Sequence, residues 1–194
     1  MAKLTFYFDP LCPWAWRTAL WVHEVQKQHP LDVQWRVFSL REINRDDDPL
    51  AVGRVELDAA LRVLVAARRV CGNDAVSRLY LALGHARHDR HENLKDTAVL
   101  EAAVVEAGLD RSLVARALDD RSTDDEALAE HREAVDGSQA FGVPWLVLDD
   151  RTFGFYGPIV LEVPTGQAAL ELWDHTSWLL TQSNFYEIKR NRTA

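Results

Sequence analysis

Cysteine is scarce in this chain of 194 residues, which holds only two, Cys12 and Cys71. A secreted domain built on disulfides carries more cysteine for its length. No uninterrupted apolar run approaches the roughly 20 residues that a membrane-spanning helix needs. The first residues also lack a basic stretch followed by an apolar one, which is typical of a secretory signal. These absences predict a cytoplasmic protein, in a compartment that keeps an unpaired thiol reduced.

Positive charge is also in short supply. The chain has 22 lysines and arginines against 30 acidic residues, which gives a formal net charge of −8. An acidic surface argues against nucleic acid or an anionic membrane as the main partner. The sequence also contains no phosphate-binding loop and no glycine fingerprint of a dinucleotide site. We therefore expect no nucleic acid, no membrane and no tightly bound cofactor.

The strongest chemical signal is the position of Cys12. It follows an alternating aromatic stretch, residues 4–8, which predicts a strand, and it precedes a helical pattern that runs from Pro13 to about Gln28. Proline is favoured at the first position of a helix. A thiol at a helix N-terminus meets unpaired N–H groups and the positive end of the helix dipole, which favour the reactive thiolate. The alternative is a small buried core residue, the usual fate of a free cysteine.

The rest of the chain predicts a split sheet with helices between its two parts. A second strand at about 32–39 gives a β-α-β unit, whose strands pair in parallel. Residues 50–135 show no strand pattern. A first helix is expected there to end at Gly72, which would leave Cys71 packed in the core. Further helices are expected to start at Asp74, to cover 96–107 and 110–120, and to start at Asp124.

Strands return at 145–148 and 152–156, joined by a turn at 149–151, and a last helix is expected at 165–181. Each outer piece is too small to hold a sheet alone. Together they predict an α/β fold with a four-stranded mixed sheet and an inserted all-helical domain. The expected boundaries are 1–45 and 136–194 for the sheet domain and 46–135 for the insertion.

Three features together resemble the DsbA-like branch of the thioredoxin superfamily. They are the helical insertion, the sequence Phe141-Gly142-Val143-Pro144 before the hairpin, and the sequence Phe8-Asp9-Pro10-Leu11-Cys12-Pro13-Trp14-Ala15-Trp16. With Gly157-Pro158 and the segments 172–174 and 185–190, the chain is similar to the actinobacterial mycothiol-dependent nitroreductase group. The resemblance implies a thioredoxin-like fold, a cis proline facing the cysteine, a low-molecular-weight thiol (mycothiol or glutathione) as co-substrate, and a nitroaromatic or disulfide acceptor.

Ala15 departs from the dithiol members of this group, which carry Cys-Pro-Trp-Cys. A dithiol enzyme releases its product when the second cysteine attacks the mixed disulfide. Cys12 has no such partner in the motif, so an external thiol would have to complete the reaction. The sequence leaves open whether Ala15 is natural or was introduced to trap a mixed disulfide.

The candidate site residues follow from the motif and the resemblance. We assign catalytic roles to Cys12, Pro13, Trp14 and Pro144. We assign substrate binding to Asn44, His88, Val143 and Trp145. Trp14 would stack on an aromatic substrate, and the resemblance places Asn44 and His88 near the thiol. The sequence also groups His85, His88 and His91, but neither cysteine nor an acidic ligand set accompanies them, so we predict no metal site.

Two other functions remain open. Kappa-type glutathione transferases and hydroxychromene carboxylate isomerases share the inserted-helix plan, but they usually place serine at the Cys12 position. The chain is alternatively a binding module that lost its redox role with the second cysteine. The oligomeric state is also open. Aromatic residues near the C-terminus form either the patch of a homodimer or a cover for the sheet: Trp173, Trp178, Phe185 and Tyr186.

Overall fold

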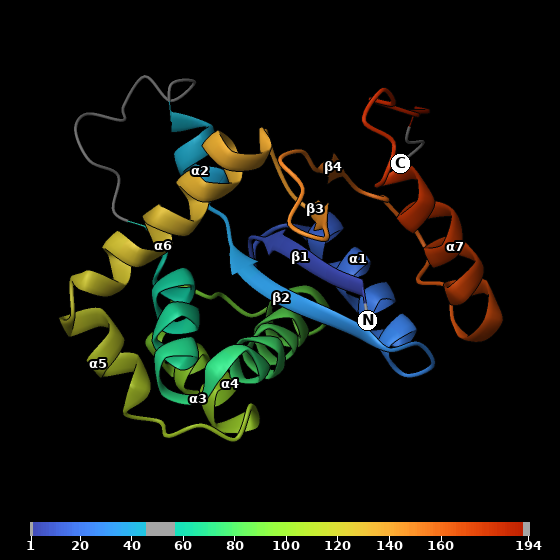
Figure 1. Cartoon of the computed structure of the whole chain (residues 1–194). Coiled ribbons are helices and arrows are strands. Elements are labelled where there is room, and N and C mark those ends of the chain that lie inside the picture. Colours follow the sequence, from blue (N-terminus) through green and yellow to red (C-terminus); the bar gives the residue numbers. More distant parts are fainter. Residues whose placement is uncertain (1, 46–56, 192–194) are drawn as a thin grey trace.

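A four-stranded mixed sheet forms the centre of the computed structural model, which describes residues 2–45 and 57–191 (Figure 1). The strands are ordered β2-β1-β3-β4. β1 runs parallel to β2 and antiparallel to β3, and β3 runs antiparallel to β4. Their bounds are Ala2–Phe8 for β1, Leu31–Val37 for β2, Trp145–Leu148 for β3 and Phe155–Tyr156 for β4. The predicted α/β class and the joining of both outer pieces into one sheet are confirmed.

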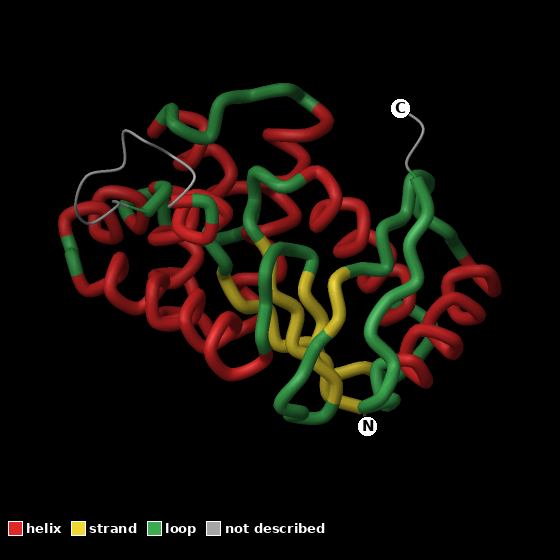
Figure 2. The backbone as a smooth tube through the Cα atoms, turned by 90° about the horizontal axis from the view of Figure 1, so that it is seen from above, coloured by secondary structure: helices red, strands yellow, loops and turns green. Residues whose placement is uncertain are grey.

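Helices account for most of the remaining structure. They are α1 (Pro13–Gln26), α2 (Leu40–Ile43), α3 (Ala59–Gly84), the π-helical turn η2 (His85–Asp89), α4 (Thr97–Glu106), α5 (Leu113–Asp119), α6 (Ser122–Arg132), the π-helical turn η3 (Glu133–Gly137) and α7 (Gly166–Leu179). Helices α3–α6 gather beside β2, and the strands lie between them and α7 (Figures 1 and 2). The acidic residues 46–48, at the start of the expected insertion, lie outside the described residues.

One face of the sheet is apolar and fully buried, because alternate residues of β1 and β2 point to the same side. The register sets Phe6 beside Trp35 and Phe8 beside Val37. Tyr80 of α3 stacks on Phe8 with the ring centroids 3.7 Å apart. His23 of α1 stacks on Trp35 at 4.8 Å. Thus α1 and α3 cover the same face, and the start of α1 is fixed against the sheet.

Side chains from the helical block bind the outer edge of β2. Asn73 accepts a hydrogen bond from the Trp35 N–H (2.9 Å) and donates one to the Val33 carbonyl (2.6 Å). Glu130 accepts a hydrogen bond from the Val37 N–H (2.8 Å). An edge strand otherwise leaves these groups unpaired. The helical block is therefore anchored to β2, which pairs with β1, the strand that leads to Cys12.

The predicted helix break at Gly72 is present, but the prediction for its neighbour is wrong. Gly72 has a φ of +74° inside α3, a conformation that glycine adopts readily. Cys71 is exposed rather than packed in the core, and Val70 is 60% exposed. Before the break, the last buried residue of α3 is Ala67, and burial resumes only at Ala75. The helix thus leaves the core before it breaks at Gly72. Extending the apolar stripe as far as Cys71 therefore placed this residue in the core wrongly.

Two further expectations from the sequence are wrong. Asp124 does not start a helix, because α6 begins at Ser122 and the Asp124 carboxylate accepts the Leu57 N–H (3.1 Å). The second hairpin strand is also shorter than predicted. Asp149 and Asp150 form a left-handed turn, with φ values of +53° and +56°, but residues 151–154 carry no strand and β4 starts only at Phe155.

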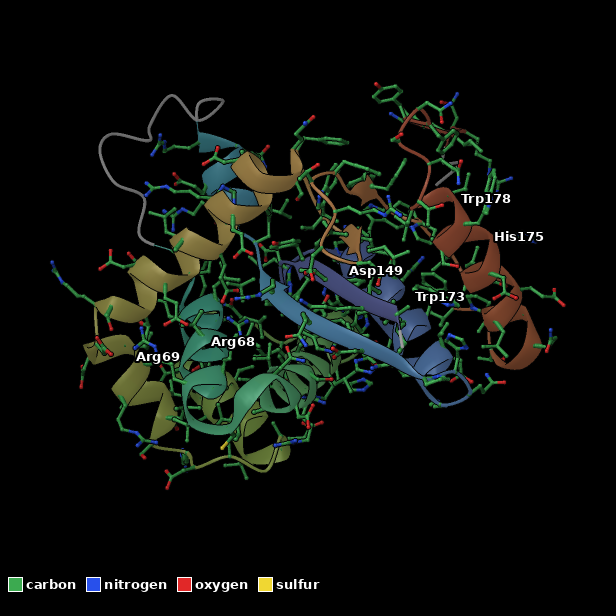
Figure 3. All side chains as sticks on the ribbon, in the orientation of Figure 1. Arg68, Arg69, Asp149, Trp173, His175 and Trp178 are labelled. Atoms are coloured by element: carbon green, nitrogen blue, oxygen red, sulfur yellow. The ribbon has the colours of Figure 1, made fainter. Side chains whose placement is uncertain are left out.

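The C-terminal aromatic residues divide into packed and exposed ones, and Figure 3 labels one of each, Trp173 and Trp178. Trp173 is 3% exposed and lies 6.2 Å from Trp21 of α1, measured between ring centroids. Phe185 stacks on Phe155 of β4 at 5.7 Å. Trp178 is 63% exposed, and Tyr186 is 85% exposed. Two of these four aromatic residues therefore pack within the chain, and the homodimer stays a prediction.

Candidate active site

Cys12 is the residue that caps the N-terminus of α1. Its backbone is extended, Pro13 is the first helical residue, and the Ala15 N–H donates to the Cys12 sulfur over 3.4 Å. The side chain is only 5% exposed. A sulfur that accepts a helix N-terminal N–H is stabilised as thiolate by that bond and by the helix dipole. The local structure is therefore the one that the position of Pro13 predicts.

The turn before β3 faces the thiol from the other end of the chain. The Cys12 S–H donates to the Val143 carbonyl over 3.4 Å. The peptide bond between Val143 and Pro144 is cis, and so is the bond between Gly157 and Pro158. Since proline has no N–H, the backbone beside the thiol offers an acceptor at Val143 and no donor at the next residue. Two of the candidate residues, Val143 and Pro144, are thus brought to Cys12.

Asp9 anchors the loop that carries the thiol. One of its carboxylate oxygens accepts the Leu11 N–H (2.9 Å), and the other accepts the Leu40 N–H (2.8 Å). The Cys12 N–H donates to the Asp9 carbonyl (2.9 Å). Burial raises the pKa of Asp9 to about 6, against the opposing effect of these two N–H bonds. The sequence singles out Asp9 only as part of a motif; its link to Leu40 depends on the fold.

Tyr80 of α3 packs against Phe8 and Trp16, close enough to Cys12 to be influenced by its charge. Its ring is fully buried, and its hydroxyl has no hydrogen-bond partner within the described residues. Burial raises the pKa of Tyr80 well above its usual value, and the nearby charges of Cys12 and Asp9 raise it further. The phenol therefore remains protonated and adds no charge near Cys12.

His88 lies against the loop that precedes Cys12. Its Nε2 is 2.9 Å from the Pro10 carbonyl, which can only accept, so Nε2 carries the proton. The imidazole stacks on Trp16 with ring centroids 6.0 Å apart, and burial lowers the pKa of His88, which favours the neutral form. A Cβ atom at Gly84 would lie 2.2 Å from the Trp16 ring. Glycine at this position therefore lets α3 approach α1 closely enough to place His88 here.

A cavity of about 540 Å³ opens along α1 from the residues on either side of Cys12. Leu11 and Pro13 contribute to its mouth. Its remaining walls come from the exposed side of α1, from η2 and the residues that follow it, and from segment 161–163. We call it the α1 cavity. Its volume is in the range of small-molecule sites.

The remaining candidate residues lie in different settings. Trp14 is half-buried, and the Arg17 guanidinium lies over its ring at 5.6 Å. Asn44 is exposed at the end of α2, where its amide donates to the Leu40 carbonyl (2.7 Å). Trp145 is 4% exposed, and its indole N–H donates to Ser138 (2.9 Å). The roles of Trp14, Asn44 and Trp145 stay predictions.

Phe141 is a further candidate, to which no role could be assigned from the sequence, although it belongs to the segment that ends at Pro144. It is 68% exposed and lies two residues before Val143. Its ring stacks on Tyr156 of β4 at 5.6 Å. The signal available in the sequence was a large aromatic residue followed by glycine, in the segment that ends at Pro144. This pair forms an aromatic surface next to the turn that faces Cys12.

The clustered histidines make other contacts. His85 lies 2.6 Å from the Asp89 carboxylate, and His88 is bonded to Pro10. Across residues 2–45 and 57–191, no group of three or more histidine, cysteine or acidic side chains is arranged to hold a metal ion. Nor does that part of the chain include a helix long and apolar enough to cross a membrane.

Comparison with known proteins gives both a family and a fold. Residues 11–190 match the family described as Rv2466c-like, mycothiol-dependent nitroreductase Rv2466c. The chain is 32% identical over 201 aligned positions to a Mycobacterium tuberculosis protein named uncharacterized protein Rv2286c. That alignment covers all of this chain and 84% of the relative.

Solved structures with lower identity show the fold. The protein described as probable DsbA oxidoreductase SCO1869 from Streptomyces coelicolor is 18% identical, with a TM-score of 0.66, covering 97% of this chain and 94% of that one. A 2-hydroxychromene-2-carboxylate isomerase is 15% identical, with a TM-score of 0.65, covering 91% and 93%. The fold is therefore the DsbA-like thioredoxin fold, and at these identities the likeness carries no activity.

Proposed function

Because the chain belongs to the Rv2466c-like family of mycothiol-dependent nitroreductases, we propose that it is a thiol oxidoreductase that works through one nucleophilic cysteine, Cys12. The observation that carries the proposal is the setting of the sulfur, which caps α1 and lies between the Ala15 N–H and the Val143 carbonyl. The co-substrate is a low-molecular-weight thiol of the mycothiol or glutathione kind, in a reducing cytoplasm.

The reaction with a disulfide acceptor takes two exchanges. The Cys12 thiolate attacks one sulfur of the acceptor, the acceptor's S–S bond breaks, and the released half leaves as a thiolate that takes a proton. An external thiol then loses its proton and attacks the mixed disulfide on Cys12, which releases a new disulfide and restores the Cys12 thiolate. With Ala15 in place of the second cysteine, this external attack is the route by which the mixed disulfide is resolved.

A nitroaromatic acceptor would also receive its electrons from thiols. Two thiols give up two electrons and two protons and become one disulfide. The nitro group accepts both electrons and both protons and becomes a nitroso group and water. One of the two thiols would be held on Cys12 as a mixed disulfide, which is the intermediate of the reaction. Both acceptors thus use the same thiol chemistry and differ only in the group that receives the electrons.

The neighbouring residues have positioning roles in this proposal. Trp14 stacks on an aromatic acceptor beside the thiol. When Cys12 is ionised, the Val143 carbonyl loses its S–H donor and accepts an N–H from the bound thiol instead. Pro144 leaves this backbone without a competing donor. His88 and Asn44 complete the contacts with substrate.

The test is turnover of a disulfide and of a nitroaromatic compound with mycothiol as reductant. We expect the Cys12→Ser protein to lose at least about 100-fold in turnover, because serine is a far weaker nucleophile at neutral pH. Cys71→Ser is the matched control and retains turnover within about twofold. Turnover that survives Cys12→Ser, or that falls equally in both variants, would overturn the proposal.

A further inference from the structure

The α1 cavity carries positive charge on a chain whose formal net charge is −8. Two arginines, Arg17 and Arg87, line it, together with His88 and His91. Its acidic side chain, Asp89, already lies 2.6 Å from the His85 ring nitrogen. Within the described residues, neither Arg87 nor His91 has an ion-pair partner, and both are exposed. Arg87 is therefore a cation at the cavity wall that makes no ion pair within the part of the chain that the structure describes.

Arg17 is fixed in position on the opposite wall. Its guanidinium donates to the Leu161 carbonyl over 2.8 Å and lies over the Trp14 ring. A guanidinium has five N–H donors in a rigid plane, so bonding to one carbonyl leaves others for a ligand. The half-buried side chain is thus held in place as a second donor facing the same space.

The rest of the lining is apolar, and part of it is exposed. Leu161 is 68% exposed and Leu11 is 37% exposed. The apolar residues of the wall are Leu11, Pro13, Trp16, Leu20, Leu161 and Val163. A site with apolar walls and a few convergent polar groups selects a ligand of matching character. This lining fits an aromatic or other apolar body that carries one negatively charged group.

The cavity lies within reach of the thiol. Leu11 and Pro13 flank Cys12, and Arg17 is five residues further along the chain from it, which is roughly 7.5 Å along the helix axis. A single substituted ring spans such a distance. The lining comes from α1, from η2 and its following residues, and from segment 161–163, whereas the Val143–Pro144 turn does not contribute to it.

Resting on the proposed function, we propose that the acceptor reduced at Cys12 is an organic anion. Its apolar body occupies the α1 cavity, and its carboxylate or sulfonate group binds Arg87 and Arg17. The thiol co-substrate lies along the Val143 backbone instead. The site thus takes acidic aromatic electrophiles in preference to neutral ones of the same shape.

Calorimetric binding to the Cys12→Ser protein tests this without turnover. The probes are 4-nitrobenzoate and its neutral counterpart 4-nitrobenzamide. We expect the carboxylate to bind at least about tenfold more tightly, which is about 1.4 kcal/mol. Adding Arg87→Gln removes this preference. Arg90→Gln is the matched control, because Arg90 is an exposed arginine that pairs with Glu92 and Glu106 and does not line the cavity.

Three results would overturn the proposal: equal binding of the two probes, equal loss in both arginine variants, or an Arg87-dependent preference for glutathione but not for 4-nitrobenzoate. The last result would assign the cavity to the thiol. The outcome is separable from that of the proposed function. A carboxylate preference without thiol chemistry at Cys12 would support the anion site in the α1 cavity and contradict the oxidoreductase. Turnover that depends on Cys12 without a carboxylate preference would support the oxidoreductase and contradict the anion site.

Discussion

The chain's two thiols lie in opposite surroundings. Cys12 is 5% exposed, caps α1, and is held between the Ala15 N–H and the Val143 carbonyl. Cys71 is exposed next to Gly72, where α3 breaks. The more accessible sulfur thus lacks the surroundings that the buried one has. Since a thiol reacts as its thiolate, the decisive difference is the Ala15 N–H and the N-terminus of α1, which stabilise negative charge on Cys12 and have no counterpart at Cys71.

The comparison also separates two parts of the fold. Cys12 lies where β1 meets α1, with a turn from the far end of the chain against it, so both outer pieces of the sheet are needed to build the site. Cys71 lies within the helical block, away from that junction along the chain. The difference shows that the split sheet brings the reactive thiol and its partners together, while the helical block supplies His88 and part of the α1 cavity.

The largest expected effect comes from giving Cys12 a partner. In Ala15→Cys, the new thiol lies one helical turn from Cys12, whose sulfur already accepts the N–H of residue 15. We expect release of a Cys12 mixed disulfide to be faster by at least about 1,000-fold at millimolar external thiol, because the attack becomes intramolecular. Stopped-flow release of a chromogenic thiol measures this rate. Ala15→Ser is the control of matched size, and equal rates in both variants would contradict the expectation.

The next effect tests the anchor of the Cys12 loop. Asp9→Ala leaves the N–H groups of Leu11 and Leu40 without their acceptors. We expect a loss of about 3 kcal/mol in the free energy of unfolding, since each unsatisfied buried donor costs roughly 1–3 kcal/mol. Urea denaturation measures it. Asp110→Ala, which removes an exposed acceptor of the Ser112 N–H, should cost clearly less. A loss below that of the control would show that Asp9 does not hold the loop.

The pH dependence gives a smaller effect in the same region. His131 is 4% exposed and its Nδ1 accepts the N–H of Ser39, the residue before Leu40. Burial lowers the pKa of His131 to about 4, so the unfolded chain binds a proton first as the pH falls. This contribution to stability is full above the unfolded pKa near 6.5 and is lost as the pH falls toward 4. It amounts to a loss of about 2 kcal/mol at about pH 5.

Comparing the wild-type protein with His131→Gln isolates that contribution. Unfolding free energies measured at about pH 7.5 and about pH 5 should fall less in the variant than in the wild-type protein. The exposed His175 on α7 (Figure 3) provides the control, and His175→Gln should leave the wild-type pH dependence unchanged. A parallel fall in wild type and His131→Gln would contradict the assignment.

The smallest effect is expected at the other thiol. Cys71→Ser replaces an exposed side chain at a helix break, so the free energy of unfolding should change by no more than about 0.5 kcal/mol. Urea denaturation tests this directly. A loss of several kcal/mol would instead indicate that Cys71 is packed, as the periodicity of α3 suggested.

The sequence predicts what depends on local pattern and misses what depends on distant contacts. Alternation gives β1 and β2, and the placing of Pro13 gives the start of α1. Helical periodicity fails at Cys71, because an apolar stripe in the sequence does not show where the helix leaves the core. Asp9 bonding to Leu40 and Asp124 bonding to Leu57 join residues far apart in the chain. No local pattern identifies such partners.

The most direct test of the central claim is mass spectrometry of the protein after incubation with oxidised mycothiol, with the modified peptide mapped. We predict one adduct, on Cys12, that persists until a free thiol is added, because no second cysteine lies in the motif to displace it. An adduct on Cys71 alone, an internal disulfide between Cys12 and Cys71, or no adduct would contradict the account.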